Sequence, residues 1–229
     1  MDIKKVVIIG SGTMGSGIAT QVANAGVSVT LLDLPSKEGS RNQITENAIK
    51  RIINSRPPLL VEKNKINLIN PGNIEDNYDE LKNADWIVEA VVERIDIKHN
   101  IYKKIEEVRK QDSIISSNTS TIPLKVLSQK MSEEMKKNFC ITHFFNPVRY
   151  MGLLEIVTEP INQKEKIESL KSFCDEKLGK GVIICNDTPG FLCNRVGVYA
   201  IQVAMTEAFK MDLTIEEADA VFGRPMGIP

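Results

Sequence analysis

The chain has 229 residues, of which 42% are apolar and 26% are charged, and its formal net charge is −1. This composition is typical of a folded globular protein and excludes a disordered chain. A near-neutral chain has no overall attraction to nucleic acid or to an anionic membrane, so we expect neither as a partner.

The first residues contain an apolar run that is too short for a signal peptide, and no stretch of about 18 apolar residues follows it. We therefore expect a cytoplasmic protein without membrane insertion. The cysteines form no C-x-x-C pair and have no histidine at ligand spacing, so we expect no metal site. Reduced, mostly buried thiols are predicted at Cys140, Cys174, Cys185 and Cys193.

Short apolar runs alternate with longer segments of helical period along most of the chain. This alternation predicts the α/β class, with a Rossmann-type, doubly wound and mostly parallel sheet covered by helices. Strands are predicted at residues 5–10, 28–33, 86–91, 113–118, 138–144, 153–158 and 181–185. Helices are predicted at residues 13–25, 39–54, 95–110, 123–137 and 163–178.

The pattern changes at "NDTPGF", because two helical segments then follow without a strand between them. We predict a Rossmann domain over residues 1–186 and the beginning of an all-helical domain over residues 187–229. So short a domain would leave apolar helix faces uncovered. We therefore expect either a truncated domain or a partner chain that covers these faces.

A glycine-rich motif follows the first predicted strand. "GSGTMGSG" places Gly10, Gly12 and Gly15 in the pattern G-x-G-x-x-G, with Thr13 and Met14 at the start of a helix. The first glycine permits a tight turn, the second lets the backbone approach a pyrophosphate, and the third allows close packing of helix on strand. The motif alone is weak evidence for a dinucleotide site.

Asp33 strengthens that interpretation, since it ends the second predicted strand about 20 residues after the glycines, as the dinucleotide fingerprint requires. A carboxylate at this place accepts hydrogen bonds from both ribose hydroxyls and repels a 2′-phosphate, so NAD is favoured over NADP. Leu34 and Pro35 add no arginine that would reverse this preference. The alternative is a glycine turn with a solvated aspartate.

His143 lies near the carboxyl end of a predicted strand, where parallel sheets bind ligands, and Glu155 lies within the apolar run "LLEIV". A buried carboxylate needs a hydrogen bond or a cation. If the two strands are adjacent, Glu155 can hold one imidazole nitrogen while the other exchanges a proton with a substrate oxygen. Two alternatives remain open: a histidine of the core, and a glutamate that pairs with Arg149 or faces solvent.

The segments "GSGTMGSGIA", "DWIVEAVVE", "SNTSTI", "HFFNPVRYMGLLEIV" and "DTPGFLCNR", in this order and spacing, closely resemble the L-3-hydroxyacyl-CoA dehydrogenases of fatty-acid β-oxidation. The resemblance extends over essentially the whole chain. It implies oxidation of an L-3-hydroxyacyl-CoA to the 3-ketoacyl-CoA with NAD as cofactor. It also implies that residues 187–229 begin a substrate or dimerisation domain. The sequence of these segments is most similar to bacterial forms that carry an enoyl-CoA hydratase domain. The implied partners are therefore a second copy of the chain or a fused or associated hydratase.

The resemblance also assigns site residues. It makes His143 the general acid/base with Glu155 as its partner, and it gives the binding of the substrate oxygens to Ser120 and Asn194. Judged from the sequence pattern alone, Ser120 could be a helix N-cap instead, and Asn194 an ordinary polar helix residue.

Further residues are implied near the cofactor. The resemblance places Glu93 and Lys98 near the nicotinamide ribose and the thioester, and Asn146 near the nicotinamide; a solvated helix start is the alternative for the first two. A basic run after Asp33 either contacts the phosphates of coenzyme A or is a solvated face. Its members are Lys37, Arg41, Lys50, Arg51 and Arg56.

Two other functions remain open at this point. One is a module that binds NAD(H) without turnover, as a fragment or a scaffold. The other is a dehydrogenase of a free, short hydroxy acid instead of a coenzyme A thioester.

Overall fold

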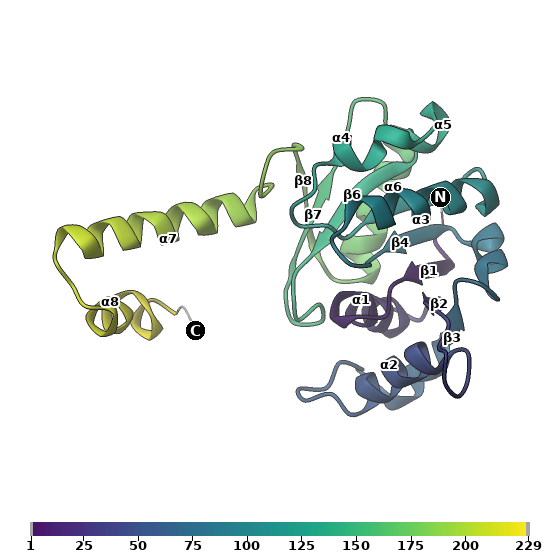
Figure 1. Cartoon of the computed structure of the whole chain (residues 1–229), viewed down its shortest axis with the longest axis horizontal. Coiled ribbons are helices and arrows are strands. Elements are labelled where there is room, and N and C mark those ends of the chain that lie inside the picture. Colours follow the sequence, from purple (N-terminus) through teal and green to yellow (C-terminus); the bar gives the residue numbers. More distant parts are fainter. Residues whose placement is uncertain (1, 228–229) are drawn as a thin grey trace. The chain divides into compact units, whose positions relative to one another are not determined.

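The computed structural model describes residues 2–227. Contacts divide the chain into two compact units, the first ending at Asp187 and the second beginning at Thr188. The predicted fold class, a Rossmann-type, mostly parallel sheet followed by helices, is confirmed (Figure 1). Among the residues described, no helix combines the length and the apolar character that crossing a membrane requires.

The first unit is built on an 8-stranded sheet in the order β3-β2-β1-β4-β5-β6-β7-β8. All neighbouring strands run parallel except β6 and β7, which are antiparallel. The order reverses between β1 and β4, which is the switch point where such sheets bind ligands. The strands are β1 Lys5–Ile9, β2 Ser28–Asp33, β3 Ile69–Asn73, β4 Trp86–Glu89, β5 Ile114–Ser117, β6 Phe139–Phe144, β7 Leu153–Val157 and β8 Gly181–Cys185.

Helices connect the strands of the first unit. They are α1 Thr13–Asn24, α2 Gln43–Ile53, α3 Ile95–Val108, α4 Leu124–Leu127, α5 Glu133–Lys136 and α6 Lys164–Ser172. Short 3₁₀ helices occupy Lys63–Leu68, Tyr78–Asn83 and Ser128–Lys130, and a π-helical turn, Phe173–Lys177, follows α6.

The second unit contains α7 Cys193–Lys210, α8 Ile215–Phe222 and the 3₁₀ turn Arg224–Met226. A capping box begins α8: the Thr214 hydroxyl accepts a hydrogen bond from the backbone of Glu217, whose side chain accepts one from the backbone of Thr214. This reciprocal pair explains why the helix starts there.

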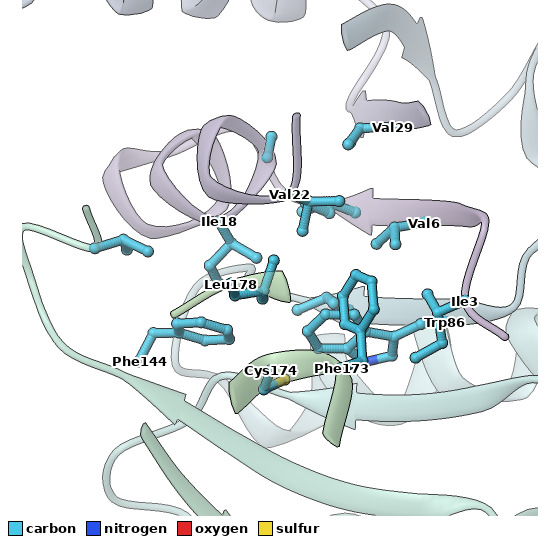
Figure 2. Packing of buried hydrophobic residues seen from close by; sticks show 14 of the residues in the cluster. Ile3, Val6, Ile18, Val22, Val29, Trp86, Phe144, Phe173, Cys174 and Leu178 are labelled. Carbon is cyan, nitrogen blue, oxygen red and sulfur yellow. The ribbon is translucent and has the colours of Figure 1, made fainter. Parts of the chain in front are cut away.

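The sheet is buried on both faces, which is why its strands are almost continuously apolar. In β1, Val6 belongs to the largest apolar cluster, while its neighbour Val7 is buried outside that cluster. Figure 2 shows this cluster, in which α1 meets the sheet and the segment after α6. Within this cluster, the Trp86 ring centroid lies 6.4 Å from that of Phe144 and 6.0 Å from that of Phe173.

The predicted strands agree with the observed ones to within about two residues at each end. One strand, β3, was not predicted from the sequence, because its residues Pro71 and Gly72 disfavour strands. The sheet accommodates them because β3 is an edge strand, so a missing N–H costs no hydrogen bond to an outer neighbour.

Two helix predictions need correction. The single helix predicted at 123–137 is wrong: Met131 is extended and Ser132 starts a new helix, since its side chain accepts a hydrogen bond from the Met135 backbone. The helix predicted from residue 39 begins only at Gln43, because Gly39 has a left-handed φ of 72° that interrupts helical backbone.

Candidate active site

The glycine-rich turn connects β1 to α1, and its glycines are required for different reasons. Gly10 has φ of 106°, and a Cβ atom there would lie 2.4 Å from the Ala90 carbonyl oxygen. A Cβ atom at Gly15 would lie 1.8 Å from the Gly10 oxygen. At Gly12, by contrast, an added Cβ would have no atom within 4 Å. The first and third glycines therefore serve packing, while the second borders open space.

Asp33, at the carboxyl end of β2, is fastened to the glycine turn. Its Oδ2 atom accepts hydrogen bonds from the Ser11 backbone and hydroxyl, both at 2.6 Å, and its Oδ1 atom accepts one from the Leu34 backbone at 2.7 Å. Arg51 of α2 donates to the Ser11 carbonyl oxygen at 3.2 Å. Asp33 is thus a half-buried, oriented carboxylate beside the turn, which differs from the solvated side chain of the alternative interpretation.

His143 and Glu155 lie directly opposite each other on β6 and β7. The Nδ1 atom of His143 is 2.6 Å from the Oε2 atom of Glu155, so the strands are adjacent in the way the proposed pairing requires. Both residues are buried, His143 with 5% of its surface exposed and Glu155 with none. A buried carboxylate in contact with an imidazole stabilises the protonated ring.

The surroundings of this pair exclude the alternatives for Glu155. Arg149 does not contact it, because its guanidinium donates to the carbonyl oxygens of Pro58 and Leu60. The Cys185 thiol is 3.9 Å from the second carboxylate oxygen of Glu155. The Phe145 ring packs against the imidazole of His143, with ring centroids 4.5 Å apart.

A second buried charge cluster lies at the carboxyl end of β4. The ammonium group of Lys98, on α3, is 2.7 Å from Glu89 and 3.1 Å from Glu93. Glu89 also accepts hydrogen bonds from the hydroxyls of Tyr102, at 2.6 Å, and Ser117, at 2.7 Å. Lys98 has 1% of its side chain exposed, so the solvated helix start considered from the sequence is wrong for this lysine.

Glu93 connects that cluster to the loop after β5. Its Oε1 atom accepts hydrogen bonds from the hydroxyls of Thr119 and Thr121, on either side of Ser120. Burial would raise the pKa of Glu93, but the hydrogen bond from Thr119 and the charge of Lys98 outweigh it and hold the pKa below its ordinary value. Glu93 is therefore an anion at neutral pH.

The geometry at the glycine turn fits a dinucleotide. Gly12 is the N-cap of α1 and provides no side chain, so the first N–H groups of this helix face the open space beside the turn. These groups and the helix dipole attract a pyrophosphate. Asp33 stands at the neighbouring strand end, where a ribose diol would donate to a carboxylate.

Residues 5–188 match the family described as 3-hydroxyacyl-CoA dehydrogenase, NAD binding domain. The chain belongs to the 3-hydroxyacyl-CoA dehydrogenase family. The resemblance inferred from the sequence motifs is thereby confirmed, as is NAD as the cofactor of this domain.

The chain spans only part of the length of its relatives. A probable 3-hydroxyacyl-CoA dehydrogenase of Deinococcus radiodurans is 42% identical over 99% of this chain, which spans 66% of that protein. The fatty acid oxidation complex subunit alpha of Pseudomonas aeruginosa is 36% identical over 99% of this chain, which spans 31% of that protein. The crystal structure of (S)-3-hydroxybutyryl-CoA dehydrogenase from Ralstonia eutropha has a TM-score of 0.78 and 30% identity, covering 94% of this chain and 75% of that one.

Within this dehydrogenase domain, the structure brings some predicted site residues together. His143 and Glu155 are in contact, and Glu93 and Lys98 are in contact. Ser120 is half-buried in the loop after β5. The N-cap of α4 is Pro123, so the alternative role of Ser120 as a helix N-cap is wrong.

Other predicted residues occupy separate places. Asn146 is exposed in the loop between β6 and β7. Asn194 lies in the first turn of α7, in the second unit, and its contact with a substrate oxygen stays a prediction. Of the basic run, Arg41 pairs with Glu75 and Asp76, which leaves it engaged at the surface.

Sequence reasoning missed Ser11, Glu89 and Asn118. Glu89 could have been found, because it stands inside the apolar run "WIVEAV", the same pattern that drew attention to Glu155. The amide oxygen of Asn118 accepts a hydrogen bond from the Phe144 backbone at 3.0 Å, next to His143. No sequence pattern distinguishes that asparagine from an ordinary loop residue. In the part of the chain that the structure describes, no group of acidic, histidine and cysteine side chains is arranged to hold a metal ion.

Proposed function

We propose that this chain oxidises an L-3-hydroxyacyl-CoA to the 3-ketoacyl-CoA with NAD⁺, as a step of fatty-acid β-oxidation. One observation carries the proposal: the buried contact between His143 and Glu155 near the carboxyl end of β6, on the same side of the sheet as the NAD-binding turn after β1. An NAD domain needs only the glycine turn and Asp33 to bind its cofactor. A buried acid/base pair beside it is explained by chemistry on a hydroxyl group.

The residues of the chain divide the reaction between them. Glu155 accepts the Nδ1–H hydrogen bond of His143, which fixes the tautomer and orients the ring so that Nε2 would take the proton of the substrate hydroxyl. The Glu155 carboxylate then stabilises the imidazolium that forms. Ser120 would bind the reacting oxygen, the same role is proposed for Asn194, and NAD⁺ would supply the hydride acceptor when it is bound.

Glu93, Lys98 and Asn146 complete the proposed site on the nicotinamide side. Support for the first two comes from the burial of Lys98 and its contact with Glu93 at the end of β4, next to the switch point. Asn146 follows β6 by two residues and thus stands near His143 in the chain.

The proposed domain organisation follows from this function. Residues 1–186 form the NAD-binding domain, and residues 187–229 begin a helical domain for substrate binding or dimerisation. The relative from Pseudomonas is named as a subunit of a fatty acid oxidation complex, which supports our proposal that the chain works fused to, or associated with, an enoyl-CoA hydratase or as a homodimer. The cytoplasmic location expected from the sequence stays a prediction.

The decisive experiment mixes the 229-residue chain with acetoacetyl-CoA and NADH and follows the absorbance of the reduced nicotinamide. The controls are free acetoacetate and a His143→Gln variant. We expect oxidation of NADH by the native chain only, and only with the thioester. Turnover of free acetoacetate would assign a hydroxy-acid dehydrogenase instead. NADH binding without turnover would leave a cofactor-binding module.

A further inference from the structure

The loop between β5 and α4 is held from both sides of Ser120 by one carboxylate. The Oε1 atom of Glu93 accepts the hydroxyl hydrogen bonds of Thr119 and of Thr121, the latter at 3.0 Å. Ser120 stands between these two threonines. Its own hydroxyl forms no hydrogen bond with another of the residues that the structure describes, so it is available to a ligand.

The Thr119 hydroxyl also sets the backbone of this loop. It accepts hydrogen bonds from the N–H groups of Thr121, at 3.3 Å, and Ile122, at 3.0 Å. A hydroxyl that donates to a carboxylate and accepts from two backbone groups fixes the turn around Ser120. The orientation of Ser120 therefore depends on where the Glu93 carboxylate lies.

Glu93 is in turn held by the buried side chain of Lys98. Its Oε2 atom contacts the Lys98 ammonium group, which Glu89 fixes from the other side. Glu89 is fully buried and takes four hydrogen bonds, from Lys98, Tyr102, Ser117 and the Val91 backbone. Such a completely bonded carboxylate has little freedom to move. By contrast, Glu93 has 38% of its side chain exposed, and without its contact with Lys98 the carboxylate would not be held in one position.

We propose that Glu89 and Glu93 are positioning residues, through which the buried Glu89–Lys98 pair and the two threonines hold the Ser120 hydroxyl toward the substrate oxygen. The inference rests on the proposed function, and it assigns Glu93 a role that does not require contact with the cofactor. A half-buried loop serine needs such a support, because displacing a substrate-binding group by about 1 Å can cost about a hundredfold in rate.

A double-mutant cycle tests this proposal. The variants Glu93→Ala and Thr121→Val are each made in the native chain and in a Ser120→Ala chain. Turnover with acetoacetyl-CoA and NADH and the affinity for each ligand are measured. In the native background we expect kcat to fall about tenfold for Glu93→Ala and about threefold for Thr121→Val, with the NADH affinity of Thr121→Val unchanged. In the Ser120→Ala background we expect neither substitution to have a further effect.

Two results would overturn the proposal. One is an equal loss in both backgrounds, which would show that Glu93 acts without Ser120. The other is an unchanged kcat for Thr121→Val in the native background, which would show that the contact of Glu93 with this loop does not position Ser120. If the native chain shows no turnover, the proposed function fails, and the same cycle measured as the affinity of the NADH-loaded chain for acetoacetyl-CoA still decides the inference.

The buried Glu89–Lys98 pair has a test of its own. In Glu89→Gln, Lys98 keeps only Glu93 as an anionic partner and draws it from the threonines, so kcat falls; Lys98→Gln releases Glu93 from its anchor, so kcat falls in this variant as well. An unchanged kcat for Lys98→Gln would contradict this order of contacts. Glu106→Gln is the matched control, because Glu106 also lies on α3 and accepts from a hydroxyl, that of Ser132. It should leave kcat unchanged.

Discussion

Glu155 faces His143 across the only antiparallel strand pair of the sheet described, and their side chains meet at 2.6 Å. Residues directly opposite each other in such a pair project from the same face. A shift of β7 by one residue would turn Glu155 to the other face and break the contact. The sheet register, more than the side-chain rotamers, therefore keeps the pair together.

The pair predicts a graded loss of activity. His143→Gln should lower kcat by about 10³-fold or more and Glu155→Gln by about 10²-fold, because one removes the base and the other only its stabilising partner. The NADH affinity should stay unchanged in both, since neither residue contacts the glycine turn. His99→Gln is the control: this ring contacts the Val126 carbonyl oxygen at 3.0 Å, away from the sheet edge. Near-native turnover of His143→Gln would contradict the mechanism.

Gly12→Ala should separate cofactor binding from stability. An added Cβ would meet no protein atom within 4 Å, so the melting temperature should stay unchanged, while the methyl group occupies the space of the pyrophosphate and weakens NADH binding at least about tenfold. Fluorescence titration with NADH and thermal unfolding measure the two effects.

Gly10→Ala is the control for the stability of Gly12→Ala, because it should destabilise the fold. Its left-handed φ and the nearby Ala90 carbonyl oxygen predict a clear loss of stability. A Gly12→Ala variant that unfolds like Gly10→Ala would show that the space beside Gly12 is not open.

Asp33 predicts the choice between the two nicotinamide cofactors. Asp33→Ala should raise the Kd for NADH about tenfold, the equivalent of about 1.4 kcal/mol for lost hydrogen bonds to a charged group. The Kd for NADPH should fall or stay constant, because the 2′-phosphate no longer meets a carboxylate. Both constants are obtained by fluorescence titration. Glu38→Ala, at an exposed position in the following loop, is the control. An unchanged ratio of the two constants would exclude Asp33 from ribose recognition.

Asp85 predicts a pH-dependent stability. Its carboxylate accepts hydrogen bonds from the backbones of Lys4 and Lys5, at 2.8 and 2.9 Å, and pairs with Lys110. Burial would raise the pKa of Asp85, but the bonds from Lys110 and the two backbone groups hold it below its ordinary value. The stabilisation is therefore fully present above the unfolded-state pKa of about 3.9 and is lost as the pH falls through the lower pKa of the folded state.

The corresponding measurement is urea unfolding of Asp85→Asn at several pH values. The variant should be about 2 kcal/mol less stable than the native chain at pH 7, and the difference should shrink below about pH 4. Asp79→Asn, whose partner Lys82 is exposed, should leave the stability unchanged. A difference that stays constant down to pH 3 would assign the effect to packing instead of charge.

The sequence by itself determined the fold class and the glycine turn, and it predicted the candidate acid/base pair that the structure brings into contact. These are local properties: apolar period distinguishes buried strands from helices, and the glycines at positions 10, 12 and 15 form a fixed spacing within one strand–turn–helix unit. A histidine and a glutamate within apolar runs can be recognised in the sequence, because buried polar groups need hydrogen-bonding or charged partners. The family resemblance then gave the pair its expected role.

Only the tertiary structure decided which residues support the site. Glu89 and Ser117 come from neighbouring strands and Lys98 from a helix, and the register of the sheet brings their side chains together. The edge strand β3 depends on pairing with β2 against its own local preference. Hydrogen bonds between residues far apart in the chain leave no period or motif in a single sequence, so the support of Ser120 by Glu93 became visible only in three dimensions.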